Sequence, residues 1–433
     1  MKRFDRFFTN VKALQAFHLM RQGAVILVAV LLAKSQLSTE VIGNFEQLLY
    51  IGYAVSFFWV AGLIQGLLSS YQDYDKGQQK AFFFNAYLLF AFLSLLLFLI
   101  LKITEPYALK VFTGKDHLDY FGWFLVYLLL NMPTYLVENF YLLRQQSKMI
   151  FGFGFYSFAG HIIAIVLPLY LGWEFGYSII GLVILAGSKH LWLWWMLIQN
   201  NYFSLDRNLQ IQWIRLSYPL MLYALLGGLM QTFDNWLINF WYQGDAEQFA
   251  IFRYGARELP LTLALASAFS TAMLPEVGKD MQKALSSIKE KSRKLFHFLF
   301  PVSILLLLGS KYWFTWVFSD AFSDSILIFN TYLLIMISRL IFSRTILVGL
   351  KDNHSVLRIS LIEFSVNVLL SFLFIYYWGL VGVAIATLFA FSLEKILLCV
   401  YLYRKHKISW TSYTDIRWWG AYSILLLIVY FLV

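Results

Sequence analysis

Two arginines four residues apart lie inside a long apolar stretch of the sequence. The segment IFRYGARELPLTLA, residues 251–264, carries Arg253, Arg257 and Glu258, and Pro260 follows them. Side chains four residues apart on a helix share one face, so we expect the two guanidinium groups to form one cationic surface. Guanidinium groups match phosphate oxygens in a bidentate geometry. The pair therefore predicts a site for an anionic, phosphate-bearing ligand.

Other ionisable residues also occupy the interiors of apolar segments. A charge at the centre of a bilayer costs roughly 2.5 to 3.5 kcal/mol, so these groups must face one another or a watery interior. The predicted substrate-binding residues are Arg21, Arg253, Arg257 and Arg339, and the predicted charge partners or ion-coupling residues are Glu46, Asp234, Glu258 and Glu363. The alternative is a set of structural ion pairs, for example Asp234 with Arg257. Charged residues near the ends of apolar segments are expected to snorkel, namely Glu138, Lys189, Arg344 and Lys395.

The elements that position these residues are predicted to be transmembrane helices. The chain of 433 residues is 60% hydrophobic and 13% charged, whereas soluble proteins are roughly 25% charged. Continuous apolar runs long enough to cross a bilayer recur along the chain, which excludes alternating barrel strands. We expect an all-α polytopic membrane protein with spans near 13–33, 41–70, 81–103, 119–142, 151–171, 178–199, 213–240, 250–274, 294–317, 326–349, 357–378, 380–403 and 416–433. Pro260 is expected to bend its span.

The distribution of positive charge predicts the orientation. The connections are short, and the longest polar one is predicted at 275–294. One set of loops holds most of the Lys and Arg, whereas the opposite set holds only Lys34, Lys102, Lys110, Lys115 and Lys311. Positive residues accumulate on the cytoplasmic side, so the amino terminus is predicted to be cytoplasmic. This bias accounts for the net charge of +10 without a nucleic-acid partner.

A weak internal repeat predicts two halves around a central cavity. Residues 38–55 align with residues 245–262, which places Glu46 opposite Arg253. A repeat with this spacing relates the halves by an axis along the membrane normal. The predicted organisation is an N-terminal six-helix half (1–200), a C-terminal six-helix half (201–404), and a cytoplasmic linker with one additional transmembrane helix (405–433).

Several kinds of chemistry have no residues to support them in this sequence. There is no GxxxxGK[ST] phosphate loop for an ATP-driven pump, and Cys399 is the single cysteine. The seven histidines show no metal-ligand spacing. The pair Asp73 and Asp75 has the spacing of a metal-binding DxD motif, but a solvated loop is the favoured interpretation. We therefore expect a protein that is not an enzyme and that has no metal and no cofactor.

Two segments resemble the multidrug/oligosaccharidyl-lipid/polysaccharide exporter superfamily, and within it the bacterial O-antigen-type polysaccharide flippases. They are FDNWLINFWYQGDAEQFAIFRYGARELPLTLALASAFSTAMLPEV (233–277) and GLVGVAIATLFAF (379–391). The resemblance implies that Arg21, Arg253 and Arg257 line a cavity and bind the diphosphate or acidic sugars of a polyprenyl-linked glycan. A thirteenth span departs from the usual twelve.

The sequence therefore predicts a flippase. It would move a polyprenyl-diphosphate-linked oligosaccharide across the bacterial inner membrane by alternating access, for cell-surface polysaccharide synthesis. The expected partners are this glycan-lipid, the membrane lipids, a coupling H⁺ or Na⁺, and a polysaccharide polymerase. The alternatives are a drug/cation antiporter of the same superfamily, a membrane glycosyltransferase or polymerase, and a scaffold without transport. The basic bias of the buried charges argues against a cation carrier, because a cation carrier needs a cavity dominated by carboxylates.

Overall fold

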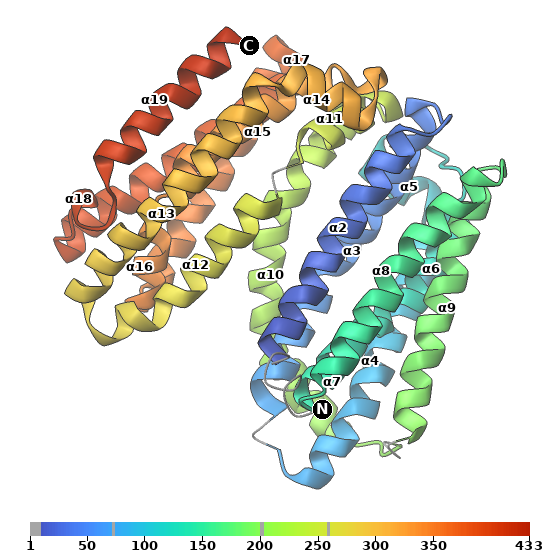
Figure 1. Cartoon of the computed structure of the whole chain (residues 1–433). Helices are drawn as coiled ribbons and strands as arrows, with labels where there is room; N and C mark the ends of the chain where they lie inside the picture. The colour runs from blue at the N-terminus through green and yellow to red at the C-terminus, as the bar shows by residue number, and fades with distance from the viewer. Residues whose placement is uncertain (1–9, 72–73, 200–202, 258–259) are drawn as a thin grey trace. The chain divides into compact units, whose positions relative to one another are not determined.

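The computed structural model describes residues 10–71, 74–199, 203–257 and 260–433, and every regular element in these ranges is a helix (Figure 1). The predicted all-α polytopic membrane fold is confirmed. Among the described residues, seven helices are long and apolar enough to cross a membrane, or up to ten if each bent pair counts as one span. The predicted spans 250–274 and 416–433 correspond to shorter apolar helices, Leu265–Leu274 and Ile416–Leu432.

The chain forms two compact units, residues 1–247 and 248–433. The helices of the first unit are α2 (Asn10–Ala33), α3 (Thr39–Ser70), α4 (Lys76–Ile103), α5 (Glu105–Thr113), α6 (Phe121–Asn131), α7 (Val137–Leu143), α8 (Ser147–Tyr170), α9 (Gly176–Gln199) and α10 (Arg207–Trp241). A 3₁₀ turn, η2 (Met132–Leu136), connects α6 and α7 and contains Pro133. Proline cannot donate a helical hydrogen bond, so it favours an interruption at this point.

Close backbone contacts join the helices of the first unit. The α3 glycine Gly62 faces Met221 of α10, and a Cβ there would lie 2.6 Å from the Met221 Cα. The Trp213 indole donates to the Leu63 carbonyl over 3.2 Å, and Gln47 donates to Asn239 over 2.7 Å. Figure 1 shows α2 running beside α8. Small residues let helix backbones approach closely, which is how helices associate in membranes.

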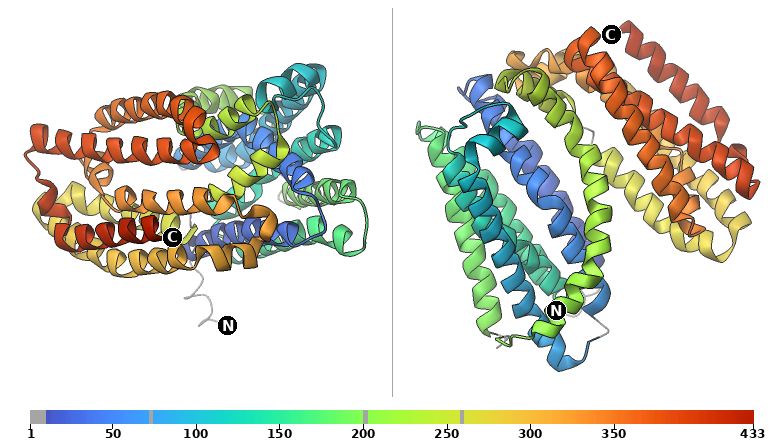
Figure 2. Two further views of the ribbon diagram at one scale, coloured as in Figure 1. Left: turned by 90° about the horizontal axis from the view of Figure 1, so that it is seen from above. Right: turned by 180° about the vertical axis from the view of Figure 1, so that it is seen from behind.

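The helices of the second unit are α11 (Ala246–Gly255, which begins at the unit boundary), α12 (Pro260–Lys279), α13 (Met281–Leu308), α14 (Ser310–Phe318), α15 (Ser325–Arg339), α16 (Ser343–Gly349), α17 (Asn353–His406), α18 (Trp410–Tyr413) and α19 (Ile416–Leu432). A 3₁₀ turn, η3 (Asp320–Phe322), precedes α15. The α13–α14 pair bends by 80° and the α15–α16 pair by 46°. Figure 2 shows α13 beside α19.

The prediction of a polar loop at 275–294 is wrong. α12 continues to Lys279 and α13 begins at Met281, after Asp280 caps the new helix by accepting from the Lys283 amide over 3.2 Å. The segment is polar because α13 starts as an amphipathic helix. It buries Ala284 and Ile288, four residues apart, and leaves the lysine-rich face exposed.

α17 is a hairpin of two antiparallel limbs. Gly379 has φ 56° and ψ −139°, a conformation that interrupts the helix and that glycine adopts without strain. Contacts across the limbs fix the register, because Ser355 donates to Tyr401 over 2.5 Å and Thr387 to Asn367 over 3.4 Å. The two limbs match the two predicted spans 357–378 and 380–403.

Equivalent helices recur at nearly constant spacing. α4 starts at residue 76 and α13 at 281, and each has 28 residues. α5 starts at 105 and α14 at 310, and each has 9 residues. α7 starts at 137 and α16 at 343, and each has 7 residues. The later helix of each pair therefore starts 205 or 206 residues after the earlier one. This spacing supports an internal repeat, while the boundaries near 200 and 404 stay a prediction.

Candidate substrate-binding site and charged clusters

The segment 251–264 does not form one continuous helix. α11 ends at Gly255, and Arg257 lies outside it. A Cβ on Gly255 would lie 2.7 Å from the Ser325 carbonyl oxygen, so α11 ends where its backbone packs tightly against the start of α15. Arg253 is on the last turn of α11. The prediction that Arg253 and Arg257 share a helix face is therefore wrong, because the helix ends between them.

An aromatic stack positions Arg257 beyond the end of α11. The Arg257 Cζ lies 4.6 Å from the centre of the Tyr254 ring. Tyr254 is fully buried, and its ring stacks on Phe322 with centroids 4.0 Å apart. The Ser325 hydroxyl donates to the Ile251 carbonyl over 2.7 Å and fixes α11 against α15. The Arg257 guanidinium is thus held on a rigid surface, while its side chain remains partly accessible.

The span around Arg257 is interrupted, as Pro260 suggested. α12 begins at Pro260, where the fixed backbone angle of proline suits the first turn of a helix. Glu258, a predicted charge partner, lies outside the described residues. Helix N-termini attract anions, and discontinuous membrane helices use them to face anionic groups. The interruption therefore combines two arginines with the start of a helix.

The predicted site residue Arg339 ends α15. Its Cζ lies 5.7 Å from the centre of the Phe391 ring on the second limb of α17. Its side chain is partly exposed, as are those of Arg253 and Arg257. The three arginines thus belong to the second unit, and each retains some accessible surface.

The predicted coupling residue Glu363 lies in a cluster of charges between α16 and α17. It is only 7% exposed, and the hairpin register places it beside Glu394, which is 1% exposed. Lys395 donates to Glu394 over 2.8 Å, and the Arg344 Nε lies 3.9 Å from the other Glu394 oxygen. Arg344 also donates to Ser360 over 2.8 Å. The expectation that Arg344 and Lys395 snorkel missed these contacts.

The first unit contains a second cluster around Lys189. The Lys189 ammonium donates to the Asn131 side-chain oxygen over 2.7 Å, and Glu138 lies within electrostatic range of it. Glu138 is only 9% exposed. Arg21, whose side chain is exposed on α2, contributes positive potential at Glu138 and Tyr135. The expectation that Glu138 and Lys189 snorkel is not met, because Glu138 is buried and Lys189 bonds Asn131.

Glu46 and Asp234 are buried on neighbouring helices of the first unit. Glu46 is 3% exposed on α3, and Asp234 is 7% exposed on α10. The Gln47 side chain, next to Glu46, bonds both Asn239 and the Gly244 carbonyl, which ties α3 to the end of α10. The alternative pair Asp234–Arg257 would join different units and stays a prediction.

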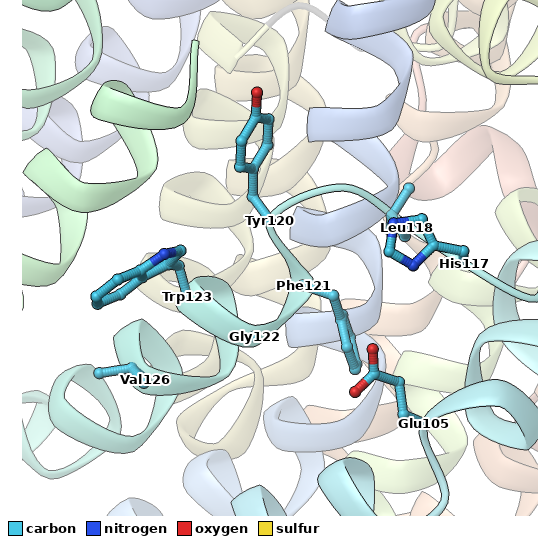
Figure 3. Close-up of a pocket in the computed structure, with 8 residues that line it drawn as sticks. All are labelled: Glu105, His117, Leu118, Tyr120, Phe121, Gly122, Trp123 and Val126. Carbon is cyan, nitrogen blue, oxygen red and sulfur yellow. The ribbon is translucent and has the colours of Figure 1, made fainter. Parts of the chain in front are cut away.

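An open pocket of about 380 Å³ lies near α5 and the start of α6, and none of the predicted site residues lines it. Figure 3 shows Glu105 beside the Phe121 ring, with Tyr120 and Trp123 pointing elsewhere. Glu105 accepts from Lys102 over 2.7 Å, and His117 contacts Asp119 over 3.4 Å. The pocket lies at the connection between the predicted spans 81–103 and 119–142, part of which is the helix α5.

Comparisons with known proteins identify the architecture. A lipid II flippase, MurJ, in an inward closed conformation matches with a TM-score of 0.76 and 16% identity, covering 98% of this chain and 92% of that one. The chain has the fold of the MOP superfamily. A multidrug resistance MATE transporter in an inward-facing conformation matches this MOP fold with a TM-score of 0.64, 14% identity, and coverage of 87% and 92%. A MOP superfamily transporter from Pyrococcus furiosus, described as having a binding pocket of reverse polarity, has a TM-score of 0.59, 14% identity, and coverage of 91% and 94%. No family model and no curated protein matches the sequence.

Sequence reasoning missed the partners that complete each cluster of this MOP fold. They are Asn131 with Lys189 in the first unit, and Glu394 with Lys395 in the second. The helix spacing is a signal for the positions of the two clusters, because Lys395 follows Lys189 by 206 residues and Arg344 follows Glu138 by 206 residues. The repeat therefore places ionisable side chains at matching positions in both units.

Proposed function

We propose that this protein is a flippase that moves a polyprenyl-diphosphate-linked oligosaccharide across the bacterial inner membrane by alternating access. The observation that carries the proposal is the interruption that follows Gly255, where Arg257 is fixed on Tyr254 and Arg253 lies on the last turn of the preceding helix. Two guanidinium groups and a helix start suit a diphosphate, whose oxygens accept charge-assisted hydrogen bonds. The MOP fold supplies a scaffold in which such a site opens to either side of the membrane in turn.

In this proposal the remaining charged residues have supporting roles. Arg21 and Arg339 contact the acidic part of the head group, since both side chains retain accessible surface. Glu46, Asp234, Glu258 and Glu363 balance these cations or bind the coupling ion, H⁺ or Na⁺. The amino terminus is cytoplasmic, and a polysaccharide polymerase receives the translocated glycan. No covalent chemistry takes place.

A drug/cation antiporter is the second candidate, and the fold match to a multidrug transporter supports it. The two functions make opposite demands on the interrupted span. A cation would be repelled by Arg253 and Arg257, whereas a diphosphate would be attracted. A transport assay with substrates of both charges therefore separates them.

The test uses purified full-length protein in liposomes that contain a fluorescent polyprenyl-diphosphate-linked oligosaccharide. The readout is the rate at which the labelled head group becomes accessible to a membrane-impermeant quencher. We expect flipping of the diphosphate lipid and little flipping of the same lipid with an uncharged head group. Equal flipping of both lipids, or transport of an organic cation in their place, would overturn the proposal. The same assay compares Arg257→Ala with Arg358→Ala. Arg358 is an exposed arginine at the start of α17 and provides the matched control.

A further inference from the structure

The second unit buries a carboxyl group that has no hydrogen-bond or ion-pair partner among the described residues. Within the described part of the chain, the Glu363 side chain makes no hydrogen bond and no ion pair, although it is only 7% exposed. An ionised carboxylate in such a place loses its hydration without compensation, at a cost of several kcal/mol. A protonated carboxyl group has a far smaller cost. Burial alone therefore favours a bound proton on Glu363 in this conformation.

The neighbouring charges strengthen this preference. Glu394 lies beside Glu363 and is already paired with Lys395 over 2.8 Å. Its second oxygen, Oε1, is buried and has no hydrogen-bond partner among the described residues. The Arg344 Nε lies 3.9 Å from that oxygen, and Arg344 directs a shorter bond of 2.8 Å to Ser360. The nearest negative charge thus opposes ionisation of Glu363, while both nearby cations are engaged with other groups.

Among the described residues, the other groups around the cluster do not supply a third carboxyl group. α15 contributes Arg339, whose guanidinium lies over Phe391. α17 contributes Cys399, whose sulfur accepts a bond of 3.2 Å from Tyr413 of α18. A metal cation would meet the positive charges of Arg344 and Lys395, and the described residues contain no group of three or more acidic, histidine or cysteine side chains that could hold a metal. The chemistry of the cluster therefore favours a proton over Na⁺.

The repeat shows that the Glu363 carboxyl is an addition to the common framework. α8 begins at Ser147 and the first limb of α17 at Asn353, so Ser157 occupies the position equivalent to Glu363. Ser157 is buried but uncharged. The lysine of the cluster, by contrast, is present in both units as Lys189 and Lys395. In the first unit, the position equivalent to Glu363 is therefore occupied by a small neutral residue. A packing role thus does not explain the carboxyl group of Glu363.

We propose that Glu363, beside the Glu394–Lys395 ion pair of α17, is the site that binds and releases the proton coupling transport to the transmembrane proton gradient. This inference rests on the proposed transport function. Glu363 binds a proton in the buried state described here and releases it when α17 and α16 separate enough to admit water. Lys395 pairs with Glu394, which leaves Glu363 without an ion-pair partner among the described residues, so the proton stays on Glu363 until water enters.

The first test measures protonation without transport. Full-length protein in lipid nanodiscs at neutral pH should show the infrared C=O stretch of a protonated carboxylic acid, and Glu363→Gln should remove part of that band. The exposed α13 acid Glu290 provides the matched control, since Glu290→Gln should leave the band unchanged. An identical carboxylic acid band in wild type and Glu363→Gln would overturn the proposal, because Glu363 would then be ionised.

The second test separates coupling from translocation. In liposomes, a proton gradient should stimulate wild-type transport, and Glu363→Gln should reduce that stimulation at least tenfold while exchange without a gradient continues. Retained stimulation in Glu363→Gln would contradict the proposal, as would a dependence on Na⁺ that Glu363→Gln removes. If wild type moves no glycan-lipid at all, the proposed substrate is wrong, and the infrared difference still decides whether Glu363 binds a proton.

Discussion

The Arg257 guanidinium carbon lies 4.6 Å from the centre of the Tyr254 ring, at the point where α11 has ended and α12 has not begun. The Tyr254 ring thus positions the Arg257 guanidinium, although Arg257 itself lies outside both helices. The Tyr254 ring is in turn fixed by its stack on Phe322. The chain therefore retains a rigid guanidinium in a segment whose backbone is interrupted, which suits a site that must open and close.

Removing the Tyr254 ring should weaken substrate binding through Arg257. A cation–π contact contributes about 0.5 to 2 kcal/mol, so Tyr254→Leu should raise the KM for the glycan-lipid by about two- to thirtyfold. Tyr254→Phe keeps the ring and should stay close to wild type. Transport kinetics on correctly folded protein measure both variants. An unchanged KM in Tyr254→Leu would show that the stack does not position Arg257 for substrate.

The α3–α10 contact predicts a strong effect of one added methyl group. Ala at Gly62 would place its Cβ 2.6 Å from both the Met221 Cα and N, which are backbone atoms and cannot move independently. We expect Gly62→Ala to destabilise the protein by about 1 to 3 kcal/mol. Gly23→Ala is the control, because Gly23 of α2 has no atom within 4 Å of the added Cβ. Thermal unfolding in detergent compares them, and equal melting temperatures would disprove the close packing.

The open end of the α17 hairpin, opposite Gly379, should depend on pH through Asp352. Lys405 donates to the Asp352 carboxylate over 2.7 Å and, together with bonds from neighbouring side chains, holds the pKa of Asp352 well below its usual value. A depressed folded pKa stabilises the protein above the unfolded pKa, and this contribution is lost as pH falls through the folded pKa. Asp352→Asn should therefore lower the melting temperature by a few degrees at pH 7.

The same reasoning fixes the pH range of the Asp352 effect. The difference between wild type and Asp352→Asn should persist at neutral pH and shrink as pH falls below about 4, the unfolded pKa of aspartate. Melting curves from pH 7 to acid measure it. A difference that grows towards low pH would have the wrong sign and would refute the role of the Asp352–Lys405 bond.

The hydropathy of the sequence was sufficient to predict most spans, because a membrane helix requires a long apolar run whatever its neighbours are. It failed at 275–294, where a helix with one lysine-rich face looks like a loop if only polarity is considered. It also failed at Gly255. A glycine inside an apolar run is compatible with a helix, and the close approach of Gly255 to Ser325 and Ile328 of α15 is a tertiary contact that the local pattern does not encode.

The candidate site was predicted in part for the same reason. Arg257 and Glu363 could be selected from the sequence because each lies in an apolar segment, where an unpaired charge costs free energy. The partners that define their surroundings come from other helices. Tyr254 meets Phe322, and Asn131 meets Lys189, through tertiary contacts that no local pattern encodes. The constant spacing between equivalent helices was the one long-range signal available.

The positive-inside bias predicts the sidedness of the loops. With Cys399 replaced by Ser, Ser286→Cys in α13 should react with a membrane-impermeant thiol reagent only from the cytoplasmic side. Asp116→Cys, beyond α5, should react only from the outside, and both positions are exposed. Reaction of Ser286→Cys in intact cells would reverse the orientation and the proposed direction of transport.

The central claim is that the arginines at the α11–α12 interruption bind an anionic head group. Equilibrium binding of a fluorescent polyprenyl-diphosphate-linked oligosaccharide to purified full-length protein tests it most directly. A charge-assisted bond contributes about 1.5 to 3 kcal/mol, so Arg257→Ala should weaken binding by about ten- to a hundredfold. Arg257→Lys should recover part of the loss, because a point charge lacks the bidentate geometry. The double variant Asp234→Asn, Arg257→Gln should bind as weakly as Arg257→Ala. Binding restored to the wild-type level in that double variant would contradict the claim, because Arg257 would then be a structural partner of Asp234 and not a ligand of the substrate.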